Sequence, residues 1–146
     1  MLQISRVRLV LDTATLVASL RSDQGASHRL LAAGLRRRFT VLASVPLLLE
    51  YEAVLTRPEH LDAARLTRDE VSVLLDAVAA VADPVTLHFV WRPHLDDPND
   101  DMVLETAVNG HADLIATFDL RHFGAAARRF GIEALRPGAC LRRLGL

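Results

Sequence analysis

Short apolar runs rich in β-branched residues alternate along the chain with longer segments of helical periodicity, and this alternation restricts the possible folds more than any other feature. Helices between consecutive strands imply right-handed crossovers, and hence a mostly parallel sheet covered on both faces. The sequence therefore predicts an α/β fold, a three-layer α/β/α sandwich, which occupies residues 1–146 as a single domain. The predicted strands span residues 6–12, 39–44, 85–91, 113–119 and 132–135.

The helical segments fall between these strands, and two of them carry local start signals. Pro46 stands at a helix-start position, where its missing N–H costs nothing. Thr67 and Glu70 have the spacing of a capping box, which predicts that a helix follows them. The predicted helices span residues 14–21, 26–38, 46–57, 71–82, 102–110, a segment near 125–130, and 137–144.

The composition excludes several classes of protein. Every basic residue is an arginine, so the lysine that a P-loop places on phosphates and the amine that a Schiff-base enzyme needs are both missing. Cys140 is the single cysteine, which rules out an internal disulfide and a cysteine-built zinc site. No apolar run approaches the roughly 20 residues of a membrane-spanning helix, and the N-terminus lacks a signal-peptide pattern. These features predict a cytoplasmic protein with no membrane association.

Three separate segments bring carboxylates to the predicted C-terminal edge of the sheet. Asp12 ends the first strand, Asp119 ends the fourth, and the acidic run DDPNDD at 96–101 follows the third. The C-terminal ends of parallel strands share one edge, where α/β proteins bind their ligands. Grouped carboxylates raise each other's pKa values, and a hard cation such as Mg²⁺ or Mn²⁺ removes that penalty. We therefore expect a metal site at this edge.

Each of these acids also has a purely structural explanation. Asp12, Asp97 and Asp119 stand where an aspartate would cap a turn or a helix N-terminus. Asp100 and Asp101 would favour the positive end of the helix that follows. A cap explains the position of each residue taken alone, but it does not explain why the three groups fall on the same edge.

The helix predicted at 46–57 adds two glutamates, Glu50 and Glu52, which periodicity alone does not separate. Both have apolar residues one helical turn away. A glutamate that faces the core without a partner would be energetically expensive. We expect one of the two to meet a charge or a metal and the other to lie in solvent.

Four segments of the chain, considered together, resemble PIN domains. They are VLDT at 10–13, LLLEYEAVLTRPEHL at 47–61, WRPHLDDPNDDMVLETAVNGHADLIATFDLRHFG at 91–124 and FGIEALRPGACLRRL at 130–144. The chain looks most like the VapC-like toxins of toxin–antitoxin systems, and the resemblance covers nearly its whole length. PIN domains are Mg²⁺- or Mn²⁺-dependent nucleases that act mostly on RNA. The resemblance therefore implies an endoribonuclease with one or two metal ions, an RNA substrate, a cognate antitoxin and a homodimeric assembly.

The resemblance also implies roles for individual residues. It places the four catalytic, metal-binding acids at Asp12, Glu50, Asp101 and Asp119. The acidic loop typical of this branch contains Asp97 and Asp100, and either could be an additional ligand. Thr13 and Thr117 stand beside the acids as supporting residues. The expected reaction is phosphodiester hydrolysis, in which the metal lowers the pKa of a bound water.

One position departs from the family pattern. Family members usually read DTN after the first strand, and this chain reads DTA, so Ala14 cannot supply the side-chain amide that the family's Asn places in the site. We expect metal binding with reduced or altered activity. The departure motivates an alternative function, a catalytically weak PIN domain that binds RNA or an antitoxin. A haloacid-dehalogenase-type phosphatase fits poorly, because it needs a second Asp where Ala14 stands and usually a lysine.

Arginines near the acidic edge could hold substrate phosphates through bidentate hydrogen bonds. Arg121 and Arg92 are the nearest in sequence, and surface ion pairs with neighbouring acids explain them equally well. The run of three arginines at 36–38 could contact a nucleic-acid backbone, although a solvated helix end is the simpler explanation.

Overall fold

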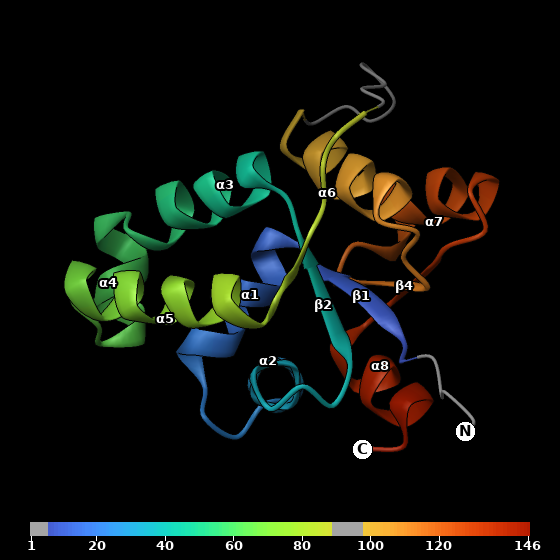
Figure 1. Ribbon diagram of the computed structural model, residues 1–146. Helices are drawn as coiled ribbons and strands as arrows, with labels where there is room; N and C mark the ends of the chain where they lie inside the picture. The colour runs from blue at the N-terminus through green and yellow to red at the C-terminus, as the bar shows by residue number, and fades with distance from the viewer. Residues whose placement is uncertain (1–5, 89–97) are drawn as a thin grey trace.

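The computed structural model describes residues 6–88 and 98–146, of which residues 98–100 are described by their backbone alone (Figure 1). In this part of the chain five strands form one parallel sheet, in the order β3-β2-β1-β4-β5. The predicted α/β fold with a parallel sheet is therefore confirmed. The strands are β1 (Arg8–Leu11), β2 (Thr40–Ala43), β3 (Asp83–Pro84), β4 (Leu114–Ala116) and β5 (Glu133–Leu135).

Helices cover both faces of this sheet. Helices α6 and α7 contact each other and form one layer, whereas α2 contacts α1, α5 and α8 in the other (Figure 1). Right-handed crossovers produce this division, because the chain moves outward in one direction from β1 to β3 and in the opposite direction from β4 to β5. The helices are α1 (Thr13–Arg21), α2 (Ala26–Leu35), α3 (Val45–Leu55), α4 (Pro58–Ala64), α5 (Arg68–Val81), α6 (Pro98–Asn109), α7 (Leu120–Arg129) and α8 (Pro137–Leu144).

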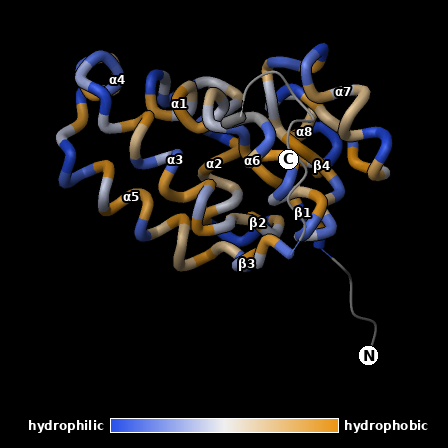
Figure 2. The backbone as a smooth tube through the Cα atoms, turned by 90° about the horizontal axis from the view of Figure 1, so that it is seen from above, coloured by the Kyte–Doolittle hydropathy of each residue, from blue (hydrophilic) through white to orange (hydrophobic). Residues whose placement is uncertain are grey.

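Strand β1 lies at the centre of the sheet and is apolar on both faces. Its Leu9 pairs with Val41 of β2 on one side and with Leu114 of β4 on the other. Leu9, Val10 and Leu11 are all buried, as expected for a parallel strand that has helices above and below it. Figure 2 shows the hydrophobic colours along the central strands and hydrophilic colours on α4 at the periphery. The strand that leads to Asp12 is thus held from both sides.

The third strand differs from the prediction. The apolar run at 85–91 was expected to form it, but β3 contains only Asp83 and Pro84, and residues 85–88 are not a strand. Pairing with β2 joins Leu42 to Asp83 and Ala43 to Pro84. Strand β2 ends there, because α3 begins at Val45. Residues 86–88 therefore have no strand beside them among the described residues, whatever their β propensity. Residues 89–91 lie outside the described part of the chain.

Helix boundaries differ at three places for local reasons. Helix α2 ends at Leu35 rather than at residue 38, because Arg37 adopts a left-handed backbone conformation with φ 59°. Helix α4 had no predicted counterpart; it is a short helix that Pro58 starts. Helix α7 begins at Leu120, well before the expected segment near 125–130, because Asp119 caps it. The predicted capping box of Thr67 and Glu70 is confirmed at the start of α5.

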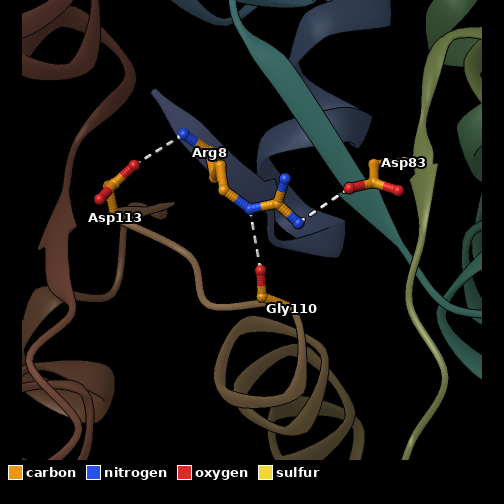
Figure 3. A network of polar contacts seen from close by, with 4 residues as sticks. All are labelled: Arg8, Asp83, Gly110 and Asp113. Carbon is orange, nitrogen blue, oxygen red and sulfur yellow. Dashed lines mark hydrogen bonds and ion pairs between the residues drawn. The ribbon is translucent and has the colours of Figure 1, made fainter. Parts of the chain in front are cut away.

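Arg8 ties together the N-terminal edge of the sheet (Figure 3). Its Nε donates to the carbonyl oxygen of Gly110 at 3.0 Å, and its guanidinium forms an ion pair with Asp83 at 2.9 Å. Its backbone N–H donates to the carboxylate of Asp113 at 2.9 Å. The end of α6 approaches the sheet closely here, since a Cβ on Gly110 would lie 2.8 Å from Cγ2 of Val85 and 3.0 Å from Cδ1 of Leu42. Arg8 of β1 thus joins β3 and the segment between α6 and β4 at this edge.

Candidate functional site

Asp12 follows β1 directly and caps the N-terminus of α1. Its Oδ1 accepts a hydrogen bond from the backbone N–H of Thr15 at 2.7 Å, while its own backbone N–H donates to the carbonyl of Ala116 at 3.0 Å. The prediction that Asp12 caps a helix is therefore confirmed. The cap uses one carboxylate oxygen, and the residue is nevertheless buried.

Thr117 connects Asp12 to Asp119 by a directed chain of hydrogen bonds. The backbone N–H of Asp119 donates to Oγ1 of Thr117 at 2.9 Å, and the hydroxyl of Thr117 in turn donates to the carboxylate of Asp12. Asp119 is exposed and caps α7 by accepting from the backbone N–H of His122 at 3.1 Å. The structure thus brings together the ends of β1 and β4 and the two aspartates that follow them.

The electrostatics of this pair explain what a ligand could do there. Burial raises the pKa of Asp12, hydrogen bonds from Thr117 and Thr15 oppose that rise, and the negative charge of Asp119 adds to it. Neighbouring Tyr51 donates its hydroxyl to the carbonyl of Leu11 at 2.5 Å. Burial raises the pKa of Tyr51, and the charge of Asp12 raises it further. The hydrogen bonds to Asp12 therefore compensate its ionised form only in part, and a cation would add to that compensation.

Glu50 and Glu52 are separated by the structure where periodicity did not separate them. Glu50 is half-buried on α3, whereas Glu52 is exposed on the same helix. Glu50 also interacts with other groups of the protein. Of the two alternatives, Glu50 is thus the residue that faces inward.

Asp101 lies in the first turns of α6 and is only 2% exposed. Its helix packs against β1, β2 and α3, so the buried face of α6 reaches the sheet near its centre. Asp97 lies outside the described residues, and Asp100 is described by its backbone alone. Among the side chains of residues 6–88 and 101–146, no three His, Cys, Asp or Glu form a group that could hold a metal ion. The described residues place Asp12 close to Asp119. Glu50 and Asp101 each interact with other groups of the protein, and their part in a metal site stays a prediction.

Three further predicted residues lie around the pair. The hydroxyl of Thr13 is buried and has no hydrogen-bond partner among the described residues. Ala14 is exposed on the first turn of α1, so a larger side chain has room there. Arg121 is exposed on the first turn of α7, two residues after Asp119. Arg92 lies outside the described part of the chain.

Sequence reasoning missed two features close to these residues. Glu105 follows Asp101 by one helical turn on α6 and is 1% exposed; its position among the apolar residues Val103, Leu104 and Ala107 could have indicated that it is buried. Phe118, between Thr117 and Asp119, has 47% of its surface exposed. The sequence places this aromatic ring between two polar residues, Thr117 and Asp119, and that placement could have indicated its exposure.

A comparison with known protein families gives one match. A family model described as a PIN domain matches residues 8–121, from the start of β1 to the first turn of α7. The matched segment contains Asp12, Glu50, Asp101 and Asp119. Among curated proteins, none matches this sequence. None of the helices described by the structure is long and apolar enough to cross a membrane.

Proposed function

The chain belongs to the PIN domain family, whose fold is that of nucleases, and on this premise we propose that it is a metal-dependent endoribonuclease. The observation that carries the proposal is the buried carboxylate of Asp12 beside the exposed carboxylate of Asp119, with Thr117 between them. A buried carboxylate with a raised pKa and a second acid beside it is typical of catalytic and metal sites.

The donor set fits a hard divalent cation. Carboxylate oxygens are the ligands that Mg²⁺ and Mn²⁺ prefer, and the pKa of Asp12 is raised by burial and by the charge of Asp119, which is the penalty that a cation removes. We propose that Asp12 and Asp119 hold one or two such ions, with Glu50, Asp101 and the acidic loop that includes Asp97 and Asp100 as the remaining ligands. When bound, the ion would lower the pKa of a water and stabilise negative charge on the phosphate.

The residues of the chain have separable tasks in this proposal. Thr117 orients the carboxylate of Asp12 through its hydroxyl, and Thr15 holds Oδ1 of that carboxylate through its backbone N–H. Thr13, whose buried hydroxyl has no hydrogen-bond partner among the described residues, supports the site beside Asp12. Arg121, exposed beside Asp119, binds a substrate phosphate. No Ser or Cys nucleophile is required.

We further propose that the protein is the toxin of a toxin–antitoxin pair, which a cognate antitoxin inhibits and which acts as a homodimer. This part of the proposal rests on the resemblance of the sequence to VapC-like toxins. A second candidate function is a catalytically weak PIN domain that binds RNA or an antitoxin. Ala14 favours it, because the exposed start of α1 presents a methyl group where the family pattern has an amide.

The test compares RNA cleavage by the wild type with cleavage by Asp12→Asn and Asp101→Asn, on mixed-sequence RNA, with Mn²⁺ and with EDTA. We expect cleavage only with the metal and its loss in both variants. Asp76→Asn, which neutralises an exposed carboxylate on α5, is the matched control and should cleave like the wild type. Tight RNA or antitoxin binding without cleavage under any condition would instead support the binding module.

A further inference from the structure

The three arginines at 36–38 do not form one solvated helix end. The backbone conformation directs their side chains into two different hollows of the surface. Arg37 is in the left-handed conformation with φ 59°, and its carbonyl oxygen accepts a hydrogen bond from Arg6. Arg36 and Arg38 line a hollow between α2 and α8, whereas Arg37 lines a second hollow at the N-terminal edge of the sheet. Neighbouring arginines of the run thus line different parts of the protein surface.

The hollow between α2 and α8, called the α2–α8 hollow below, has a volume of about 470 Å³. Its floor is apolar, with Ala32, Ala33 and Leu141, and its rim carries three arginines and a histidine. The helices that form it lie next to each other in the layer opposite α6 and α7 (Figure 1). The lining residues are His28, Arg29, Ala32, Ala33, Arg36, Arg38, Leu141, Gly145 and Leu146.

The charge of this hollow is not neutralised by carboxylate side chains. None of its lining residues is an Asp or a Glu, and Arg29, Arg36 and Arg38 are exposed and form no ion pair with any other described residue. The second hollow differs, because its Arg8 is paired with Asp83 at 2.9 Å (Figure 3). The three positive charges around this hollow repel one another. A bound anion would attract all three and so offset the repulsion.

His28 adds a fourth polar group of fixed orientation. Its Nδ1 lies 3.1 Å from the carbonyl oxygen of Ser19. A carbonyl can only accept, so Nδ1 carries the proton, and Nε2 is the nitrogen that is left to meet a ligand. The hollow therefore offers guanidinium groups suited to phosphate oxygens above an apolar floor suited to a base or a ribose.

We propose that the α2–α8 hollow is a second nucleic-acid site, in which Arg29, Arg36 and Arg38 bind phosphate groups of a single strand at a distance from the acidic residues. The inference rests on the proposed function in so far as the ligand is the RNA substrate. Arg36 and Arg38 precede β2, so the site lies toward the N-terminal edge of the sheet, whereas Asp12 and Asp119 follow β1 and β4. A strand of four residues spans about 13 Å, so only substrates of several nucleotides can occupy both sites.

The experiment measures binding of a labelled oligoribonucleotide of about 15 nucleotides, within the roughly 4–16 nucleotides that single-strand sites cover. All proteins carry Asp12→Asn and the assay contains EDTA, so that no cleavage occurs. The test variant is Arg36→Gln with Arg38→Gln. The matched control is Arg37→Gln with Arg68→Gln, which removes the same charge from outside the hollow.

We expect the test variant to bind about 5–10-fold more weakly near physiological salt, and the slope of log K against log salt to fall by about 1.4, since each single-strand phosphate contact contributes about 0.7. The control should change both quantities much less. Arg29→Gln added to the test variant should weaken binding again. Equal losses in the test and control variants would overturn the proposal, because they would indicate general charge rather than a site.

Two further arms identify the source of the phosphate. Inorganic phosphate should compete with the oligonucleotide only at concentrations far above that of the strand; tight phosphate binding that the test variant abolishes, with no strand binding, would overturn the nucleic-acid assignment. With Asp12 restored and Mn²⁺ present, the arginine variants should slow cleavage of long substrates and leave that of dinucleotides unchanged. Absence of cleavage in the wild type, with the binding differences intact, would refute the nuclease and not this site.

Discussion

Ser44 and Thr106 lie 62 residues apart in sequence, and their hydroxyl oxygens lie 2.7 Å apart in the core. The hydrogen bonds around them run in one direction: the N–H of Leu47 donates to Ser44, Ser44 donates to Thr106, and Thr106 donates to the carbonyl of Met102 at 2.8 Å. Ser44 caps α3, which carries Glu50, and Thr106 belongs to α6, which carries Asp101. One buried pair therefore fixes the two helices that contribute candidate ligands.

Thr106→Val should lower the free energy of unfolding by roughly 1–3 kcal/mol, because the same shape is kept while the buried hydroxyl of Ser44 loses its acceptor. Urea denaturation measures the change. Thr56→Val is the control, since Thr56 makes a similar bond to the carbonyl of Glu52 on the surface and should change stability by less than about 0.5 kcal/mol. Equal losses in both variants would contradict a special role for the buried pair.

Tyr51→Phe should destabilise the protein by about 1 kcal/mol, because it removes the hydroxyl that donates to the carbonyl of Leu11 at 2.5 Å. Leu11 is the last residue of β1 and precedes Asp12, so the cleavage rate should fall as well. Denaturant unfolding and single-turnover cleavage measure the two effects. An unchanged rate with reduced stability would show that Tyr51 supports the fold and does not position Asp12.

Asp12→Asn should raise the melting temperature at neutral pH while it abolishes cleavage. Burial raises the pKa of Asp12 above its ordinary value of 3.8, so the stability that this carboxyl contributes is fully present below pH 3.8 and is lost as the pH rises through the raised pKa. The advantage of the variant should therefore shrink as the pH falls toward 3.8. Thermal melts across this range measure it.

The same melts test metal binding independently of activity. Mn²⁺ should stabilise the wild type by mass action, by about 2.7 kcal/mol at 100 times the dissociation constant, and should stabilise Asp12→Asn much less. If Mn²⁺ raised the melting temperature of both proteins equally, the ion would be bound elsewhere.

Ala14→Asn should increase cleavage by about 2–10-fold, the effect of one added hydrogen bond of roughly 0.5–1.5 kcal/mol in the transition state. Ala14 is exposed at the start of α1, so the amide has room there. Ala14→Leu, which adds volume without the amide, should not increase cleavage. Steady-state kinetics compare the two variants with the wild type. No gain with Asn would show that the missing amide does not limit the reaction.

The fold followed from local patterns wherever a strand or helix had its own signal. The capping box of Thr67 and Glu70 and the apolar run of β1 were predicted and found, because each depends on neighbours within a few residues. The strand expected at 85–91 is absent over residues 85–88, the part that the structure describes, because pairing requires a partner and β2 ends at Ala43. The left-handed Arg37, which divides the arginine run, could not be read from three identical residues.

For the candidate site, the sequence alone determined which carboxylates follow strands, and parallel topology then implied a shared edge for Asp12 and Asp119. Only the tertiary structure decided that Thr117 joins these two aspartates, that Glu50 faces inward where Glu52 does not, and that Glu105 is buried beside Asp101. The physical reason is that periodicity fixes the face on which a residue lies, whereas burial and hydrogen bonding depend on which other element packs against that face.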